Sequence, residues 1–295
     1  MKNVLSYYYN LYSDEIRLNG ENYYFKSNNE NYVLFLYKNE IHKLQETYNL
    51  YLEAIKMGIY SHQIILNRNN QLLTEYNDRK YILMKLYEDL SKKIDMKDII
   101  YFGNVTGKFD GDNAWKKLWS NKIDYFEYQI SQIGKKYPLI RKSFPYYAGI
   151  AENGICLLNR KYSGKCSIAH KRMAETDSLF EFYNPLNYII DIKVRDSAEF
   201  FKSMLFREED VLENIKIYIA TAHLTEDELY YFFIRMLYPS FYFDLYEQIV
   251  ENKLEESKIK EAIKITPIYE KLIKKLYQYL KNIIQLPEID WLEII

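Results

Sequence analysis

The sequence predicts an α+β protein built from two lobes, a small β-rich lobe over residues 1–90 and a mostly helical lobe over residues 113–295. Short aromatic and β-branched runs broken by polar turns fill the first lobe, as is typical of strands. Apolar residues at helical spacing dominate the second lobe. A polar passage at 91–112 with two of its glycines at Gly103 and Gly107 predicts a linker between the lobes.

In the first lobe, residues 22–26 and 32–37 are apolar runs separated by the polar turn SNNEN, which predicts a hairpin. Residues 41–57 carry apolar side chains at helical spacing and stop at a glycine, so we expect one helix there. Residues 64–66 and 80–87 predict two further strands.

The second lobe opens on a predicted long helix at 113–136, whose tryptophan and aliphatic residues form one stripe. Thr225 with Glu228 forms a capping-box pattern for a helix at 226–238. Further helices are expected at 211–222 and 243–256. Thr266 and Pro267 form an N-cap and first-turn pair that predicts the start of the last helix.

The central segment of this lobe, residues 168–202, carries the charged residues of most interest. We expect a loop with His170, a buried strand at 186–190 that ends on Asp191, and a turn with Arg195 and Asp196 before a helix. A carboxylate at the exposed end of an apolar strand is a common place for a metal or a phosphate.

Composition excludes several classes of protein. Hydrophobic residues make up 48% and charged residues 27%, which are globular values, and the net charge of −1 argues against a dedicated nucleic-acid binder despite 32 tyrosines. Cys156 and Cys166 are expected to be reduced thiols, since no Cys/His set has zinc spacing. The N-terminal residues lack the apolar core and cleavage site of a secretory signal, and no apolar run is long enough to span a membrane.

Four segments carry a family resemblance: IAHKRM at 168–173, NPLNYIIDIKVRDSAEFFKS at 184–203, RMLYPSFYFDLYE at 235–247 and LPEIDWL at 286–292. They resemble the endospore coat-associated kinase-like proteins, the spore coat S group and its YutH-type branch, within the aminoglycoside-phosphotransferase superfamily. The resemblance implies a bilobal protein-kinase-like fold and a sporulating Firmicutes source. It also implies coat proteins as partners, and a location in the mother-cell cytoplasm and then in the spore coat.

Phosphoryl transfer in this superfamily needs a base, magnesium ligands and a lysine on the phosphates. The resemblance puts the base two residues after His170, where this chain has Arg172, which cannot accept a proton at neutral pH. The ligand amide expected five residues further falls at Asp177. Asn184 or Asn187 would replace it only if the loop is re-spaced.

Asp191 matches the magnesium-binding aspartate of the superfamily and, with Asn187, would contact a cofactor if ATP and magnesium bind at all. Asp196 matches the superfamily's structural aspartate, but with Glu199 it also has the pattern of a helix cap, which we favour. Arg195 is expected to pair with a nearby carboxylate at the surface rather than with a bound phosphate.

The phosphate-binding lysine belongs in the strand at 32–37, which reads YVLFLY and contains none. Lys26 and Lys38 flank that strand. Glu46 and Glu53, the candidate helix partners of such a lysine, are expected to be solvated charges, and there is no glycine run to cradle phosphates.

Three functions remain open from the sequence. The first is a pseudokinase that acts as a structural or interaction component of spore coat assembly. The second is a divergent, active small-molecule kinase that uses Asp191. The third is a pseudokinase that still binds nucleotide as a conformational switch. The missing charges at Arg172 and at 32–37 favour the first.

Overall fold

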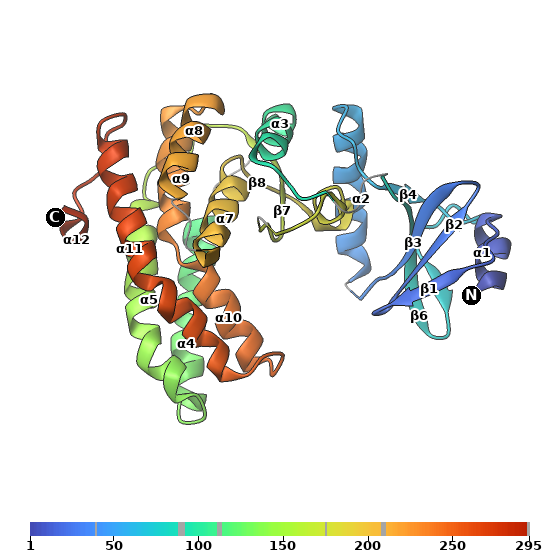
Figure 1. Cartoon of the computed structure of the whole chain (residues 1–295), viewed down its shortest axis with the longest axis horizontal. Coiled ribbons are helices and arrows are strands. Elements are labelled where there is room, and N and C mark those ends of the chain that lie inside the picture. The colour runs from blue at the N-terminus through green and yellow to red at the C-terminus, as the bar shows by residue number, and fades with distance from the viewer. Residues whose placement is uncertain (39, 88–91, 111–113, 175, 208–210, 294–295) are drawn as a thin grey trace. The chain divides into compact units, whose positions relative to one another are not determined.

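The chain forms two compact units (Figure 1). The computed structural model describes residues 1–38, 40–87, 92–110, 114–174, 176–207 and 211–293. The first unit comprises Met1–Ile94 and Asp177–Ile189, and the second comprises Asp95–Thr176 and Ile190–Ile295. The segment 168–202, predicted to lie wholly in the helical lobe, is therefore divided between the units.

The first unit contains an antiparallel sheet in which β1, β2, β3, β6 and β4 are neighbours in that order, with β5 paired to β6. The strands are β1 Ile16–Asn19, β2 Asn22–Ser27, β3 Glu30–Leu36, β4 Gln63–Ile65, β5 Thr74–Tyr76 and β6 Arg79–Lys85. The predicted hairpin is confirmed as β2–β3, with Phe25 opposite Tyr32. Its turn residues Asn28 and Asn29 both have positive φ, a conformation asparagine tolerates and tight hairpins require.

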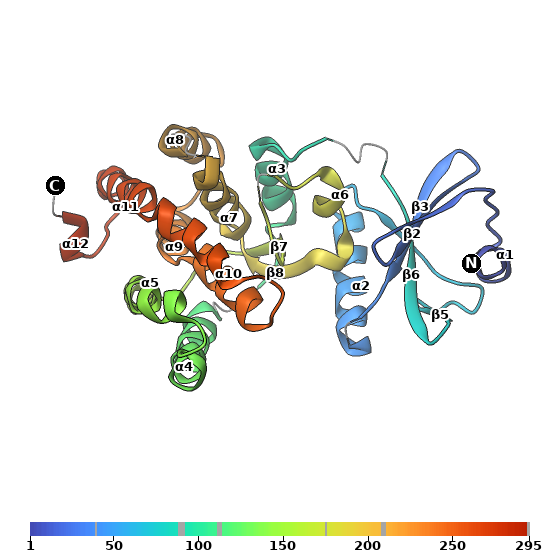
Figure 2. The same cartoon turned by 60° about the horizontal axis from the view of Figure 1, so that its bottom comes forward.

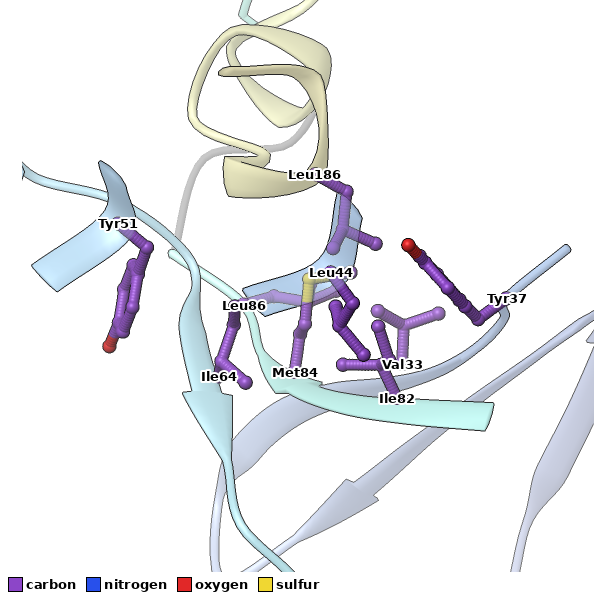
Figure 3. Close-up of a cluster of buried hydrophobic side chains, with 9 residues drawn as sticks. All are labelled: Val33, Tyr37, Leu44, Tyr51, Ile64, Ile82, Met84, Leu86 and Leu186. Carbon is purple, nitrogen blue, oxygen red and sulfur yellow. The ribbon is translucent and has the colours of Figure 1, made fainter. Parts of the chain in front are cut away.

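Both faces of this sheet are covered by other parts of the first unit. Alternate residues of β3 point to opposite sides, so the strand contributes to a cluster on each face. Val33 belongs to a cluster with Leu44 and Tyr51 of α2 (Ile41–Lys56), and Figure 3 shows the side chain of Leu186 pointing toward that cluster. Leu34 belongs to a second cluster with Leu5 of α1 (Lys2–Tyr9). The helix predicted at 41–57 is thus confirmed as the cover of one face.

The predicted linker at 91–112 is instead occupied by a helix, α3 (Met96–Thr106), which belongs to the second unit. Asp95 and Asp98 form a capping box at its start: the backbone N–H of Lys97 donates to Asp95 and the N–H of Asp95 donates to Asp98. Ile99 and Phe102 then bury one face. The capping pattern was present in the sequence, but the polar composition hid it. Residue 91 and residues 111–112 of the passage lie outside the described part of the chain.

The second unit is mainly helical (Figure 2). Its longer helices after α3 are α4 Trp115–Ile133, α5 Pro138–Leu157, α7 Arg195–Met204, α8 Val211–Thr221, α9 Glu226–Leu237, α10 Ser240–Val250 and α11 Ile259–Lys281. The capping box of Thr225 and Glu228 on α9 is confirmed. No helix in the described part of the chain is both long and apolar enough to cross a membrane.

The predicted start of the last helix at Thr266 and Pro267 is wrong, because α11 begins at Ile259 and contains Pro267 in its interior. Proline removes one helical hydrogen bond. Here the buried stripe of the helix runs from Ile259 through Tyr269 and beyond, and its packing keeps the helix continuous across the proline. The Thr266 hydroxyl donates to the carbonyl of Ala262 instead of capping.

Candidate functional site

The charged residues of the central segment lie on two short strands and the helix that follows them. Strand β7 (Cys166–His170) is buried along its whole length and pairs with β8 (Tyr188–Ile192). His170 is therefore the last residue of a buried strand rather than part of a loop. Asp191 lies within β8, and α7 begins directly at Arg195, so the predicted turn is already helical.

Asp196 holds His170 in place. The backbone N–H of His170 donates to Oδ1 of Asp196 over 3.0 Å, and its Nδ1 donates to Oδ2 over 2.6 Å. Both residues are buried, with exposures of 1% and 5%. Asp196 is the second residue of α7, whose N-cap is Val194 and has no side-chain cap bond. The capping interpretation of Asp196 is therefore wrong, because its carboxylate faces β7 and not the helix end.

Asp191 is mostly buried, with a side-chain exposure of 13%, and both of its carboxylate oxygens are engaged. Trp115 Nε1 donates to Oδ1 over 2.7 Å, and so does the backbone N–H of Ile192. Nη1 of Arg195 donates to Oδ2 over 2.6 Å. The expectation of an exposed carboxylate at a strand end is wrong, because α4 brings Trp115 against it.

Arg195 forms the predicted ion pair, but the pair is mostly buried rather than on the surface, with 15% of the arginine side chain exposed. Its Nε donates to the carbonyl oxygen of His170 and its Nη2 to that of Lys171, each over 3.1 Å. A planar guanidinium, with its N–H groups in fixed directions, can donate to the carboxylate and to both carbonyl oxygens at once.

These residues do not fit a magnesium ion. Magnesium takes six oxygen ligands in near-octahedral geometry and gives up water reluctantly. Oδ1 of Asp191 faces two N–H donors and Oδ2 faces a guanidinium. Within the described residues, no group of three His, Cys, Asp or Glu side chains is arranged to hold a metal ion.

Arg172, at the position of the missing base, points to solvent and pairs with Asp244 of α10. Its side chain is 66% exposed. A guanidinium there neutralises a carboxylate of another helix and accepts no proton.

In the first unit, the position of the phosphate-binding lysine is apolar. The face of β3 turned to α2 carries Val33, which belongs to the cluster of Figure 3, and Phe35, which is partly buried and packs against that cluster. Lys26 is exposed on β2, and Lys38 pairs with Glu21 near the surface.

The acidic residues of α2 agree with the expectation of solvated charges. Glu46 is exposed and Glu53 pairs with Lys56 of the same helix. The buried face of α2 carries Leu44, Thr47, Tyr51 and Ala54.

The candidate replacement ligands lie in the segment that joins the first unit. The Asn184 side chain accepts from the N–H of Leu186 and caps the short 3-10 turn η1 (Pro185–Asn187). The Asn187 amide donates to the carbonyl of Glu181. The carbonyl of Asp177 accepts from the N–H of Ile94. A contact of Asn187 with a nucleotide stays a prediction.

Sequence reasoning missed a buried charged cluster beside the site, in the second unit. Lys202 donates to Glu199, to Ser240 and to the carbonyls of Arg235 and Tyr238. Arg235 also donates to Glu199 over 2.6 Å, and its guanidinium lies over the rings of Trp115 and Trp119.

Burial lowers the pKa of Lys202 to about 8, although Glu199 opposes the shift. Burial favours the neutral form of Glu199, but Lys202 and Arg235 outweigh it and hold the pKa of that carboxyl far below its usual range. The spacing of Glu199 and Lys202 by three on a helix was the one local signal of this cluster.

The family of this chain follows from comparison with known proteins. The family model described as "Spore coat putative kinase YutH" matches residues 2–283. The chain belongs to this family.

The endospore coat-associated protein YutH of Bacillus subtilis is a relative of this YutH-family chain, 24% identical over 208 residues. That match covers 60% of this chain and 61% of the relative, so the chain spans about three-fifths of the length of the curated protein.

Solved structures agree on the fold. An aminoglycoside phosphotransferase from Alicyclobacillus acidocaldarius superposes with a TM-score of 0.66 at 8% identity, over 96% of this chain and 97% of that one. The amicoumacin kinase hAmiN superposes with a TM-score of 0.58 at 11% identity, over 93% and 94%. The bilobal kinase-like fold predicted from the sequence is thus confirmed.

Proposed function

We propose that this YutH-family protein has lost phosphotransfer and serves as a structural or interaction component in assembly of the spore coat. Its partners would be coat proteins, and it would be made in the mother-cell cytoplasm before joining the coat. The name of the Bacillus subtilis relative, endospore coat-associated, supports the location.

One observation carries the loss of catalysis. Asp191, the residue that matches the magnesium-binding aspartate, uses both carboxylate oxygens in contacts to Trp115, to its own backbone neighbour and to Arg195. A metal ion would have to displace these donors. Two further observations support the loss of phosphotransfer: an arginine, Arg172, stands at the position of the base, and the face of β3 where the lysine belongs is apolar.

The test is the response of the purified chain to ATP with and without magnesium. With one compromised metal ligand and no strand lysine, we expect a Kd no better than about millimolar, which is about 4 kcal/mol at standard state. At ATP equal to that Kd, linkage gives about 0.4 kcal/mol. That amounts to a melting shift of about one degree for a chain of this size.

Asp191→Asn should leave this small shift unchanged, and Asp110→Asn is the matched control, since Asp110 is an exposed aspartate whose partner is Lys165. A magnesium-dependent shift of several degrees that Asp191→Asn abolishes and Asp110→Asn retains would establish a nucleotide site and reject the scaffold.

Activity is measured in parallel with sugars, amino alcohols and aminoglycosides as acceptors. A positioned base contributes roughly 100- to 10,000-fold. Turnover at about 1–100 per second, as in working kinases, would show that the chain is an enzyme.

A further inference from the structure

The guanidinium of Arg195 meets three oxygen atoms from three residues. Nη1 contacts Oδ2 of Asp191, Nε contacts the carbonyl of His170 and Nη2 contacts the carbonyl of Lys171. One carboxylate and two carbonyls are hard oxygen donors, the ligand type that divalent cations prefer. In this chain the cation among them is a side chain.

We propose that the guanidinium of Arg195 takes the place of a divalent metal ion at Asp191. Through its hydrogen bonds it holds β7, β8 and α7 together. This inference rests on the proposed function and names the device behind it. A guanidinium stays charged at every pH at which proteins fold, so β7, β8 and α7 stay connected without a bound metal ion.

The sequence position of Arg195 explains how one residue can do this. Strand β8 ends at Ile192 and α7 begins at Arg195, so the arginine follows Asp191 by four residues and returns to it. Its neighbour Asp196 accepts from the N–H of His170 while Arg195 donates to the carbonyl of the same residue. Two adjacent side chains thus bind both backbone polar groups of His170.

The other side of Asp191 is closed by an indole. Trp115 Nε1 donates to Oδ1, and the guanidinium of Arg235 lies 5.0 Å from the centre of a Trp115 ring. A positive charge behind the indole reinforces the repulsion of a second cation. Both oxygens of the Asp191 carboxylate therefore face N–H donors of the described residues.

The proposal predicts that removal of the guanidinium lets a divalent cation bind. Arg195→Met removes the charge and keeps most of the stem. Arg195→Gln is made in parallel, because its amide can still donate to one of the carbonyls if the methionine variant does not fold. The probe is Mn²⁺ alone, measured by electron paramagnetic resonance of the free ion and by the Mn²⁺ dependence of the melting temperature.

We expect Mn²⁺ to bind Arg195→Met or Arg195→Gln at least about tenfold more tightly than the unaltered chain. Asp191→Asn in the same variant should return the affinity to the starting level. Arg160→Met is the matched control: Arg160 contacts Asp227 over 2.5 Å within the same unit, so this variant loses the same charge and the same type of pair. It should bind Mn²⁺ no better than the unaltered chain.

Equal Mn²⁺ affinity in the unaltered chain and in both Arg195 variants would overturn the inference and leave the proposed function standing. A gain that Arg160→Met shares would also overturn it, since net charge alone would then explain the effect. Tight Mn²⁺ binding by the unaltered chain would instead contradict the proposed function itself.

Discussion

His62 should make the first unit lose stability in mild acid, at pH values where the imidazole of the folded protein is still neutral. The side chain is 1% exposed. Its Nε2–H donates to the carbonyl of Phe180 over 2.9 Å, and its Nδ1 accepts from the N–H of Tyr87 over 3.1 Å. Protonation of Nδ1 would set two donors against each other in a buried place.

The magnitude follows from the pKa. Burial lowers the pKa of His62 from 6.5 to about 4. The unfolded chain takes up a proton near pH 6.5 while the folded chain does not, so stability is complete above that pH and falls as the pH drops toward about 4. Each pH unit in this window costs about 1.4 kcal/mol, so the loss between pH 7 and pH 5 is about 2 kcal/mol.

The assay is urea unfolding at pH 7 and pH 5, followed by circular dichroism, because Trp115, Trp119 and Trp291 all lie in the second unit and tryptophan fluorescence would not report on the first. Other groups also titrate in this range. The measured quantity is therefore the difference between two losses of unfolding free energy from pH 7 to pH 5, that of the unaltered chain and that of His62→Gln. The glutamine of this variant cannot titrate but can still donate to the carbonyl of Phe180.

His42→Gln is the matched control, since His42 is exposed and pairs only loosely with Glu40. We expect it to keep the full acid loss of the unaltered chain, whereas His62→Gln should lose about 2 kcal/mol less between the two pH values. Equal losses in all three proteins would refute the reasoning, because His62 would then titrate alike in the folded and unfolded states.

Two further predictions concern the site. Asp196→Ala should cost more than about 2 kcal/mol in urea unfolding, since each unsatisfied buried donor of His170 costs about 1–3 kcal/mol. Asp196→Asn should recover less than half of that loss, because the two donors of His170 bind different carboxylate oxygens and the amide replaces one of these oxygens with an NH2 donor. Full recovery by asparagine would restore the capping interpretation. Arg172→Ala should change the free energy of unfolding by less than about 1 kcal/mol, as exposed ion pairs do, and a larger loss would mean that its contact with Asp244 holds the site together.

The sequence by itself determined those features that short-range rules govern. The hairpin of β2 and β3 follows from alternation and from the asparagine turn, α2 follows from helical spacing, and the start of α9 follows from Thr225 and Glu228. The missing lysine of β3 and the arginine at position 172 were also visible in the sequence, because a family pattern compares residue types at fixed positions.

Composition and local pattern misjudged two elements where packing competes with propensity. The polar residues of 91–112 predicted a linker, yet Ile99 and Phe102 have enough buried surface to hold α3 in place. Pro267 predicted a helix start, yet the buried stripe on both sides of it keeps α11 continuous. Local preferences differ by a few kcal/mol at most, and burial of several side chains exceeds that.

Only the tertiary structure decided what the charged residues do, because their partners are distant in the chain. Asp191 meets Trp115 from 76 residues away, and His170 meets Asp196 from 26 residues away. A carboxylate at a strand end has the same sequence whether it faces water, a metal or a guanidinium. The solvation and the charge of its surroundings decide between these states, and both are set by which helices pack against it.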